Sequence, residues 1–319
     1  MEKVWGGHSL EGVLGISLAD RGPIGETWEL VDRLEENSVV RGGTHDGREL
    51  RDLRATDREA LLGATRPTAE DRFPVLVKYI STSQALSVQV HPDDAAAERL
   101  HSGESGKTES WYIIDAEPDS QIHLGLREGV DPSELVRCAG GAGVVDLLQT
   151  FPVRPGQFIH VPAGTLHAIG KGITLVEVQQ NSDVTYRLYD WGRVGLDGQP
   201  RPVHVDECLM AARYDGPTPG PTLPEVEPVD AGGREARLVE TETYALALLE
   251  VDGARLLETE GRAQALVFLE GSGRLLVEGS DERLEFTAGE TWLVPASVGA
   301  YEVAAGGDML RFLLVETRS

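Results

Sequence analysis

The stretch GQFIHVPAGTLHAIGKGITLVEVQQNSDVTYRLYDWGR, residues Gly156–Arg193, organises this chain around runs of β-forming residues. The triplet Pro162-Ala163-Gly164 interrupts the apolar run at its start, and His167 follows. Proline presets its own φ and glycine tolerates unusual backbone angles, so the triplet predicts a tight turn. We expect the chain to reverse there and to carry His167 on the next strand.

A second group of polar residues lies far upstream in SVQVHPDD, where Gln89 and His91 stand two residues apart. On a strand both side chains project from the same face. Glu109 stands at the start of another apolar run, residues 111–114. This run can form a strand that pairs with the strand of Gln89 and His91. With His167, these residues offer one amide oxygen, one carboxylate and two imidazoles. This is a reasonable ligand set for a divalent transition metal, with a position left for substrate.

The composition indicates which classes of ligand the chain can bind and in which cellular compartment it works. The net charge of −24, from 53 acidic and 29 basic residues, argues against nucleic-acid and anionic-membrane partners. A phosphate-bearing ligand must therefore find local basic residues. The two cysteines, Cys138 and Cys208, support neither a disulfide framework nor a cysteine zinc site. With no signal-peptide region and no apolar run of membrane-spanning length, we expect a soluble cytoplasmic protein. The sequence leaves open whether it is a monomer or a homodimer.

The order of secondary-structure signals predicts mainly strands with a few helical insertions. We expect strands at 24–30 and 73–79, and helices within 48–65, 92–100 and 131–148. The glycines at 140, 141 and 143 interrupt the last of these helices.

A proline-rich segment divides the chain. We expect a catalytic, metal-binding domain with short helical insertions over 1–215, a linker over 216–236 and a second all-β domain over 237–319.

The two domains repeat one motif. In the first copy, Gly156 is followed after five residues by Pro-Ala-Gly and, after two more residues, by His167. The second copy has the same spacing, with Gly289, Pro-Ala-Ser and Ala300. We infer a duplicated β-barrel of which only the N-terminal copy kept its metal.

Both motifs resemble the cupin pattern, which implies a mostly β chain with two jelly-roll barrels and a few short helices inserted in the N-terminal part. The resemblance narrows further. SVQVHPDD, GKTESW, PAGTLHA and TYRLYDWGR, together with the N-terminal KVWGG and IGETWEL, resemble the short bacterial branch of the type I mannose-6-phosphate isomerases over nearly the whole chain. This family implies an intramolecular oxidoreductase of carbohydrate metabolism that interconverts mannose 6-phosphate and fructose 6-phosphate.

The same resemblance implies roles for individual residues. One zinc ion per chain, in the N-terminal barrel, is bound by Gln89, His91, Glu109 and His167. Arg187 is the catalytic arginine, and the substrate pocket is lined by Lys78, Lys107 and Glu177. One departure is Ile169, which stands where the longer eukaryotic branch has a tyrosine.

The chemistry explains these residue types. Aldose–ketose interconversion moves a proton between C1 and C2 through a cis-enediol, whose negative charge a metal ion and Arg187 can stabilise. Glu177 or Lys107 would carry the proton; Lys107 is a candidate because neighbouring positive charges lower a lysine pKa. The sequence does not show which of these two residues transfers the proton. For substrate binding we expect Lys78, Lys107 and Arg187.

Two other functional classes fit parts of the pattern. A pair of histidines with one carboxylate also describes a non-haem iron oxygenase, which a cupin can host. Gln89 as a fourth ligand and the nearby Lys107 and Arg187 weigh against it. A non-catalytic sugar-binding cupin predicts degraded ligands, as in the C-terminal copy, whereas the N-terminal copy keeps a full set.

Overall fold

The computed structural model describes residues 1–319 except 16–21, 216–217, 230–231 and 281. None of the helices in these described ranges is long and apolar enough to span a bilayer.

Contacts along the chain define two compact units, which we call the N-terminal and C-terminal units. The N-terminal unit comprises Met1–Glu11, the described part of Ile16–Thr27, and Lys78–Leu223. The C-terminal unit comprises Gly12–Gly15, Trp28–Val77 and Pro224–Ser319. The predicted limits of independently folding domains stay a prediction. Four residues of the predicted linker, 216, 217, 230 and 231, lie outside the described ranges.

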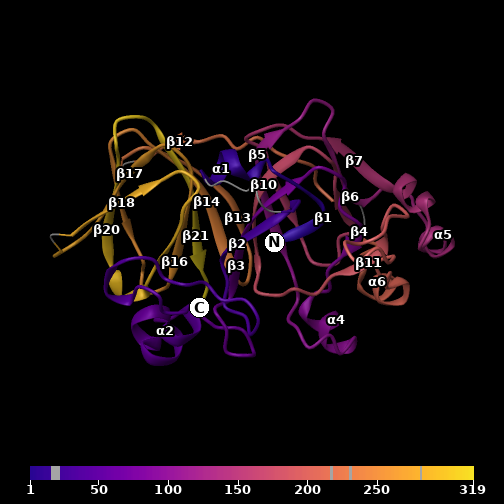
Figure 1. The fold of residues 1–319 in the computed structure, drawn as a ribbon, viewed down its shortest axis with the longest axis horizontal. Coiled ribbons are helices and arrows are strands. Elements are labelled where there is room, and N and C mark those ends of the chain that lie inside the picture. Colours follow the sequence, from indigo (N-terminus) through magenta and orange to yellow (C-terminus); the bar gives the residue numbers. More distant parts are fainter. Residues whose placement is uncertain (16–21, 216–217, 230–231, 281) are drawn as a thin grey trace. The chain divides into compact units, whose positions relative to one another are not determined.

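Two five-stranded sheets carry the predicted site (Figure 1). The first sheet has the order β2 (Glu26–Leu30), β3 (Val75–Thr82), β10 (Ile173–Gln180), β5 (Glu109–Ala116) and β8 (Phe158–Val161). The second has the order β11 (Tyr186–Tyr189), β4 (Val88–Val90), β9 (His167–Ile169), β6 (Gln121–Leu126) and β7 (Leu148–Pro152). A separate strand, β1 (Glu2–Gly7), starts the chain.

The two sheets pack face to face over an apolar core. Trp111 and Ile113 of β5 belong to the same buried cluster as Ile122 of β6 and Ile169 of β9. Alternation along each strand turns these side chains inward. A side chain of this size contributes roughly 1.5–3 kcal/mol when it is fully buried.

The helices are short. They are α1 (Leu10–Leu14), α2 (Leu50–Thr56), α3 (Arg58–Leu62), α4 (Asp94–Arg99), α5 (Pro132–Cys138) and α6 (Val205–Ala211), with 3-10 turns at Gly43–His45, Ala142–Leu147 and Ala296–Val298. The predicted helical segments contain α2 to α5. The segment 131–148 is broken after Cys138, where Ala139 leaves the helical conformation with ψ 137° and Gly140 follows in the left-handed region with φ 77°.

One predicted pairing is wrong. The strand of Gln89 does not pair with the strand of Glu109: β4 pairs with β11 and β9, whereas β5 pairs with β10 and β8. Alternation identifies a strand and its inward face, but both sheets have such a face, so the pattern does not name the partner.

The C-terminal unit contains a six-stranded and a four-stranded sheet (Figure 1). The first has the order β12 (Glu227–Pro228), β13 (Arg234–Glu240), β14 (Tyr244–Val251), β21 (Leu310–Thr317), β16 (Gln264–Glu270) and β19 (Thr291–Val294). The second has the order β15 (Ala254–Glu258), β20 (Ala300–Ala305), β17 (Ser272–Val277) and β18 (Arg283–Thr287). Phe268 of β16 stacks on Phe286 of β18 with ring centroids 3.7 Å apart, which joins the two sheets.

The repeated motif has the same local structure in both units. Gly156 and Gly289 take φ 84° and 90°, and strands β8 and β19 begin two residues later. Strands β9 and β20 then begin at His167 and Ala300, the aligned positions. The prediction of a mostly β chain with two jelly-roll units is confirmed. In the described ranges each unit has two separate facing sheets, not a closed barrel.

Candidate active site and metal centre

A cavity of about 210 Å³ lies in the N-terminal unit. Its lining includes six predicted site residues: Lys78, Gln89, Lys107, Glu109, Glu177 and Arg187. The two predicted histidine ligands are only 1% exposed and lie behind this lining. The structure thus brings together all the residues that the sequence singled out, around one cavity.

Three buried side chains converge beside the cavity. Nε2 of His91 lies 3.1 Å from Oε1 of Glu109, and Nε2 of His167 lies 3.7 Å from Oε2 of the same carboxylate. The candidate ligand atoms of the three residues all lie within 4.8 Å of one another. Nε2 of Gln89 is 3.5 Å from the first imidazole and 3.3 Å from the second. All four predicted ligands therefore surround one point.

The outer nitrogens of the imidazoles fix their tautomers. Nδ1 of His91 lies 2.6 Å from the carbonyl oxygen of Val184, and Nδ1 of His167 lies 2.9 Å from that of Thr165. A carbonyl oxygen only accepts, so each Nδ1 must donate and each Nε2 turns a lone pair toward Glu109. This second hydrogen bond is how proteins orient metal-binding histidines.

Glu109 has an unsatisfied oxygen at the same point. Its Oε2 is buried and accepts no hydrogen bond from the described residues. A buried acceptor without a partner costs free energy, and two imidazole lone pairs beside it supply no proton. A divalent cation would satisfy all three groups, so the donor set fits a metal ion. For Gln89 to join as a ligand its amide must turn over, because its Oε1 now accepts from Ser87 at 3.0 Å.

The charges around the cluster shift its pKa values. Burial lowers the pKa of both imidazoles, that of His91 to about 4, with the positive charge of Lys107 adding to the effect. Burial by itself would raise the pKa of Glu109, but Lys107 and the imidazoles hold it well below its usual range. The cluster therefore presents neutral imidazoles and a charged carboxylate at neutral pH, the forms that bind metals.

The groups around Lys107 shift its pKa in opposite directions. Its Nζ lies 2.9 Å from Oε1 of Glu109, and the negative charges of Glu109 and Glu177 outweigh the lowering effect of burial, so its pKa is raised. The sequence places the lysine near other positive groups, but it does not show that a carboxylate contacts it directly.

Glu177 has a different environment from Glu109. It lies on β10 opposite Trp111 of β5, whose indole Nε1 donates to Oε2 of Glu177 at 3.0 Å. Nζ of Lys78 lies 3.5 Å from the other oxygen. Burial, with the charge of Glu109, raises the pKa of Glu177 to about 7 despite the two nearby lysines. A carboxyl with this pKa exchanges protons readily at neutral pH.

Arg187 lies on β11 directly opposite Gln89 of β4, and it lines the cavity. Its guanidinium makes no hydrogen bond or ion pair with the described residues. Burial, followed by the positive charge of Arg201, lowers its pKa below that of a free arginine. The group remains a cation whose donors are available to a bound anion.

The structure adds residues that the sequence did not single out. Trp111 holds Glu177, and the cavity lining also contains Glu26, Asp183 and Arg201. Lys3 pairs with Glu26, which in turn lies 3.9 Å from Lys78. No periodic signal marks these residues, because their placement depends on which strands and loops pack together.

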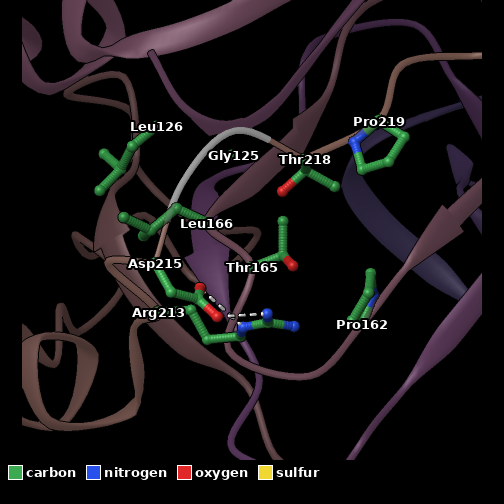
Figure 2. A pocket seen from close by; sticks show the side chains of 9 residues that line it. All are labelled: Gly125, Leu126, Pro162, Thr165, Leu166, Arg213, Asp215, Thr218 and Pro219. Atoms are coloured by element: carbon green, nitrogen blue, oxygen red, sulfur yellow. Dashed lines mark hydrogen bonds and ion pairs between the residues drawn. The ribbon is translucent and has the colours of Figure 1, made fainter. Parts of the chain in front are cut away.

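A second cavity, of about 90 Å³, lies elsewhere in the same unit (Figure 2). Its lining contains none of the predicted site residues, and its ionic groups are the paired Arg213 and Asp215, 2.6 Å apart. We therefore assign the chemistry to the first cavity.

The C-terminal unit has other residues at the corresponding positions. Glu109 pairs with Val161, the last residue of β8, and Gln264 pairs with Val294, the last residue of β19. Gln264 accepts a hydrogen bond from Tyr301 at 2.6 Å in the buried core. The amide of Gln264, already bonded to a tyrosine, and the methyl group of Ala300 thus stand at the positions where the N-terminal unit has a carboxylate and an imidazole.

Comparison with known proteins gives one family. A family model for the catalytic domain of type I phosphomannose isomerase matches residues 1–118. The chain is 39% identical over 224 residues, 70% of its length, to the mannose-6-phosphate isomerase ManA of Bacillus subtilis, and 39% identical over 208 residues to the mannose-6-phosphate isomerase of Streptococcus mutans. The chain spans 64 to 67% of the length of the curated relatives that it matches.

A solved structure extends the likeness to the whole chain. The crystal structure of the mannose 6-phosphate isomerase from Bacillus subtilis superimposes with a TM-score of 0.88 at 30% identity. The match covers 99% of this chain and 96% of that one.

Proposed function

The chain belongs to the type I phosphomannose isomerase family, a family of aldose–ketose isomerases, and we propose that it interconverts mannose 6-phosphate and fructose 6-phosphate. The observation that carries the proposal is the buried His91, Glu109 and His167 cluster beside a cavity that also presents Glu177 and Arg187. We place the reaction in the cytoplasm, which the two free cysteines support.

The direct test is a coupled assay for fructose 6-phosphate on purified protein supplied with mannose 6-phosphate. Glucose 6-phosphate, which differs only in configuration at C2, is the control substrate. If no fructose 6-phosphate forms from mannose 6-phosphate with metal-loaded protein, the proposed function is wrong.

The donor set supports zinc as the metal, held by Gln89, His91, Glu109 and His167. Two borderline imidazole nitrogens with harder carboxylate and amide oxygens make a mixed donor set that suits this ion. When bound, zinc would supply a Lewis acid that lowers the energy of negative charge on the sugar oxygens.

The environment of Glu177 favours it as the group that moves the proton between C1 and C2 through a cis-enediol. Its pKa of about 7 lets it accept and return a proton at neutral pH. Trp111 donates to one carboxylate oxygen and so limits its rotation. Lys107 stays protonated beside Glu109, which suits it to donating hydrogen bonds to substrate oxygens, and we assign Lys78 and Lys107 to substrate binding with Arg187.

We assign Arg187 to the charge that develops during proton transfer. It faces the cavity from the strand position opposite Gln89, and its donors are not occupied by described residues. A fixed cation aimed at an enediolate acts more strongly in the transition state than in the bound substrate.

Replacing Arg187 by alanine should lower turnover by about 100- to 1000-fold, the scale of losing one preorganised oxyanion partner. The metal content should stay normal, since the guanidinium contacts none of the proposed ligands. Steady-state kinetics with mannose 6-phosphate, with metal measured on the same samples, would check both expectations.

The Arg187→Lys variant is the matched comparison. Lysine offers a point charge in place of a planar fork of donors, so it should restore only part of the turnover. Normal turnover in a metal-replete Arg187→Ala protein would remove this residue from the chemistry.

A further inference from the structure

One part of the cavity is positively charged although the chain as a whole carries a net charge of −24. Arg187 and Arg201 both line the cavity, and the positive charge of Arg201 lowers the pKa of Arg187, after burial itself. Arg193 lies close to both. These three guanidinium groups outnumber the nearby carboxylates, Asp183 and Asp190, whose charges act on Arg187 in the opposite direction.

Arg201 is held so that one side of its guanidinium stays available. Its Nε donates to Oδ2 of Asp190 at 2.8 Å and its Nη2 to Oδ1 at 2.5 Å. Its Nη1 donates to none of the described residues. Asp190 is only 6% exposed, and it also accepts from Arg193 at 2.8 Å. A buried carboxylate held by two arginines therefore fixes the orientation of Arg201.

The other cations of the cavity pair with carboxylates that also line it. Lys107 lies 2.9 Å from Glu109, Lys78 lies 3.5 Å from Glu177, and Lys3 pairs with Glu26. Among the described cations of the lining, Arg187 and Arg201 are the two that form no ion pair with a carboxylate of the lining itself, since Asp190, the partner of Arg201, is not part of it.

The strand register gives the two arginines different places. Arg187 lies opposite Gln89, next to the proposed metal ligands. Tyr189 pairs with Val88, one position farther from His91, and Asp190 follows it. Asp190, which holds Arg201, thus lies beyond the pair of Arg187 and Gln89 along β11, on the side away from His91. In a hexose 6-phosphate, the phosphate is at the opposite end of the carbon chain from the reacting C1 and C2.

We propose that Arg201 binds the phosphate of the substrate and that Asp190 is its positioning residue. This assignment rests on the proposed function, because it places C1 and C2 of a sugar phosphate at the metal end of the cavity. A phosphate dianion matches the excess positive charge, and a guanidinium edge matches its oxygens. Arg201 then determines preference for phosphorylated over free sugars.

Replacing Arg201 by glutamine should raise the KM for mannose 6-phosphate by about 10- to 100-fold, the usual effect of losing a charge-assisted hydrogen bond. Turnover should change by less than about 3-fold, because the contact is the same in the ground and transition states. Isomerisation of free mannose, which has no phosphate, should be equal in the variant and the wild type. Arg201→Lys should recover part of the lost affinity.

The matched control is Arg213→Gln. Arg213 also pairs side-on with a carboxylate, Nε and Nη2 to Asp215 at 3.1 and 2.6 Å, but it lines the other cavity (Figure 2). Its replacement removes the same charge from the same unit, so it should leave the KM unchanged. An equal rise of KM in both variants would show a general charge effect and overturn the proposal.

Calorimetry with inorganic phosphate tests the anion site independently of turnover. Wild type and Arg213→Gln should bind phosphate, and Arg201→Gln should bind it at least about 10-fold more weakly. Equal phosphate binding, an unchanged KM, or a loss confined to turnover in Arg201→Gln would overturn the assignment. Protein that binds phosphate through Arg201 but does not isomerise mannose 6-phosphate would overturn the proposed function and leave the anion site standing.

Discussion

Protein stripped of divalent metal by a chelator should lose essentially all isomerase activity, and zinc should restore it. None of the described residues supplies a hydrogen bond to Oε2 of Glu109, and the two imidazole lone pairs face the same point, so this cluster is built for an ion. Stabilisation of charge on O1 and O2 by a Lewis acid is worth several kcal/mol, so its loss removes several orders of magnitude in rate. Metal analysis and coupled kinetics on the same samples measure both effects.

His167→Ala should abolish metal binding as well as activity, and it should leave the fold intact because the surrounding core is apolar. Circular dichroism would check the fold. We expect one zinc per chain, since Ala300 and Gln264 replace an imidazole and a carboxylate in the C-terminal unit. Full activity in stripped protein, or a second stoichiometric metal, would contradict the assignment.

Glu177→Gln should lower turnover by about 100- to 10,000-fold, the range for removing a positioned general base. The amide keeps the shape of the side chain and can still accept from Trp111, but it cannot take a proton. Metal content should not change, because Glu177 is not among the proposed ligands.

The pH dependence has a definite direction. A base acts in its deprotonated form, so kcat/KM should rise with pH and level off once Glu177 has lost its proton. The pKa of about 7 sets the upper limit for this rise, and a bound cation, which favours the carboxylate, shifts it to lower pH. Glu177→Gln should abolish the rise. Lys107→Met is the comparison: if it removes the rise and Glu177→Gln keeps its turnover, the lysine is the base.

The positions of several site residues could be predicted from the residues next to them in the sequence. The Pro-Ala-Gly turn places His167 at the start of β9, and alternation puts Gln89 on an inward face. Such features depend on neighbouring residues only. The aligned glycines at 156 and 289 similarly identified the duplication, because a left-handed angle is required at both.

Features that depend on tertiary packing were not predictable in this way. The sheet partner of β4 is set by packing between segments far apart in the chain. Arg201 lies in a loop without periodicity, and its place in the cavity lining follows from its ion pair with Asp190 at the end of β11. The direction of the pKa shift of Lys107 likewise depends on how its side chain meets Glu109 and Glu177, and residue types alone do not give this arrangement.

Strands β4 and β5 lie in different sheets, and this affects the stability of the N-terminal unit. Glu109 comes from one sheet and His167 from the facing sheet, so an ion held by both would act as a cross-link between layers. Its binding free energy would oppose their separation. In the C-terminal unit the stacked Phe268 and Phe286 join the two layers without any ion. Removing the ion would then lower the unfolding free energy of the N-terminal unit, whose apolar core still holds its layers together, and would leave the stability of the C-terminal unit unchanged.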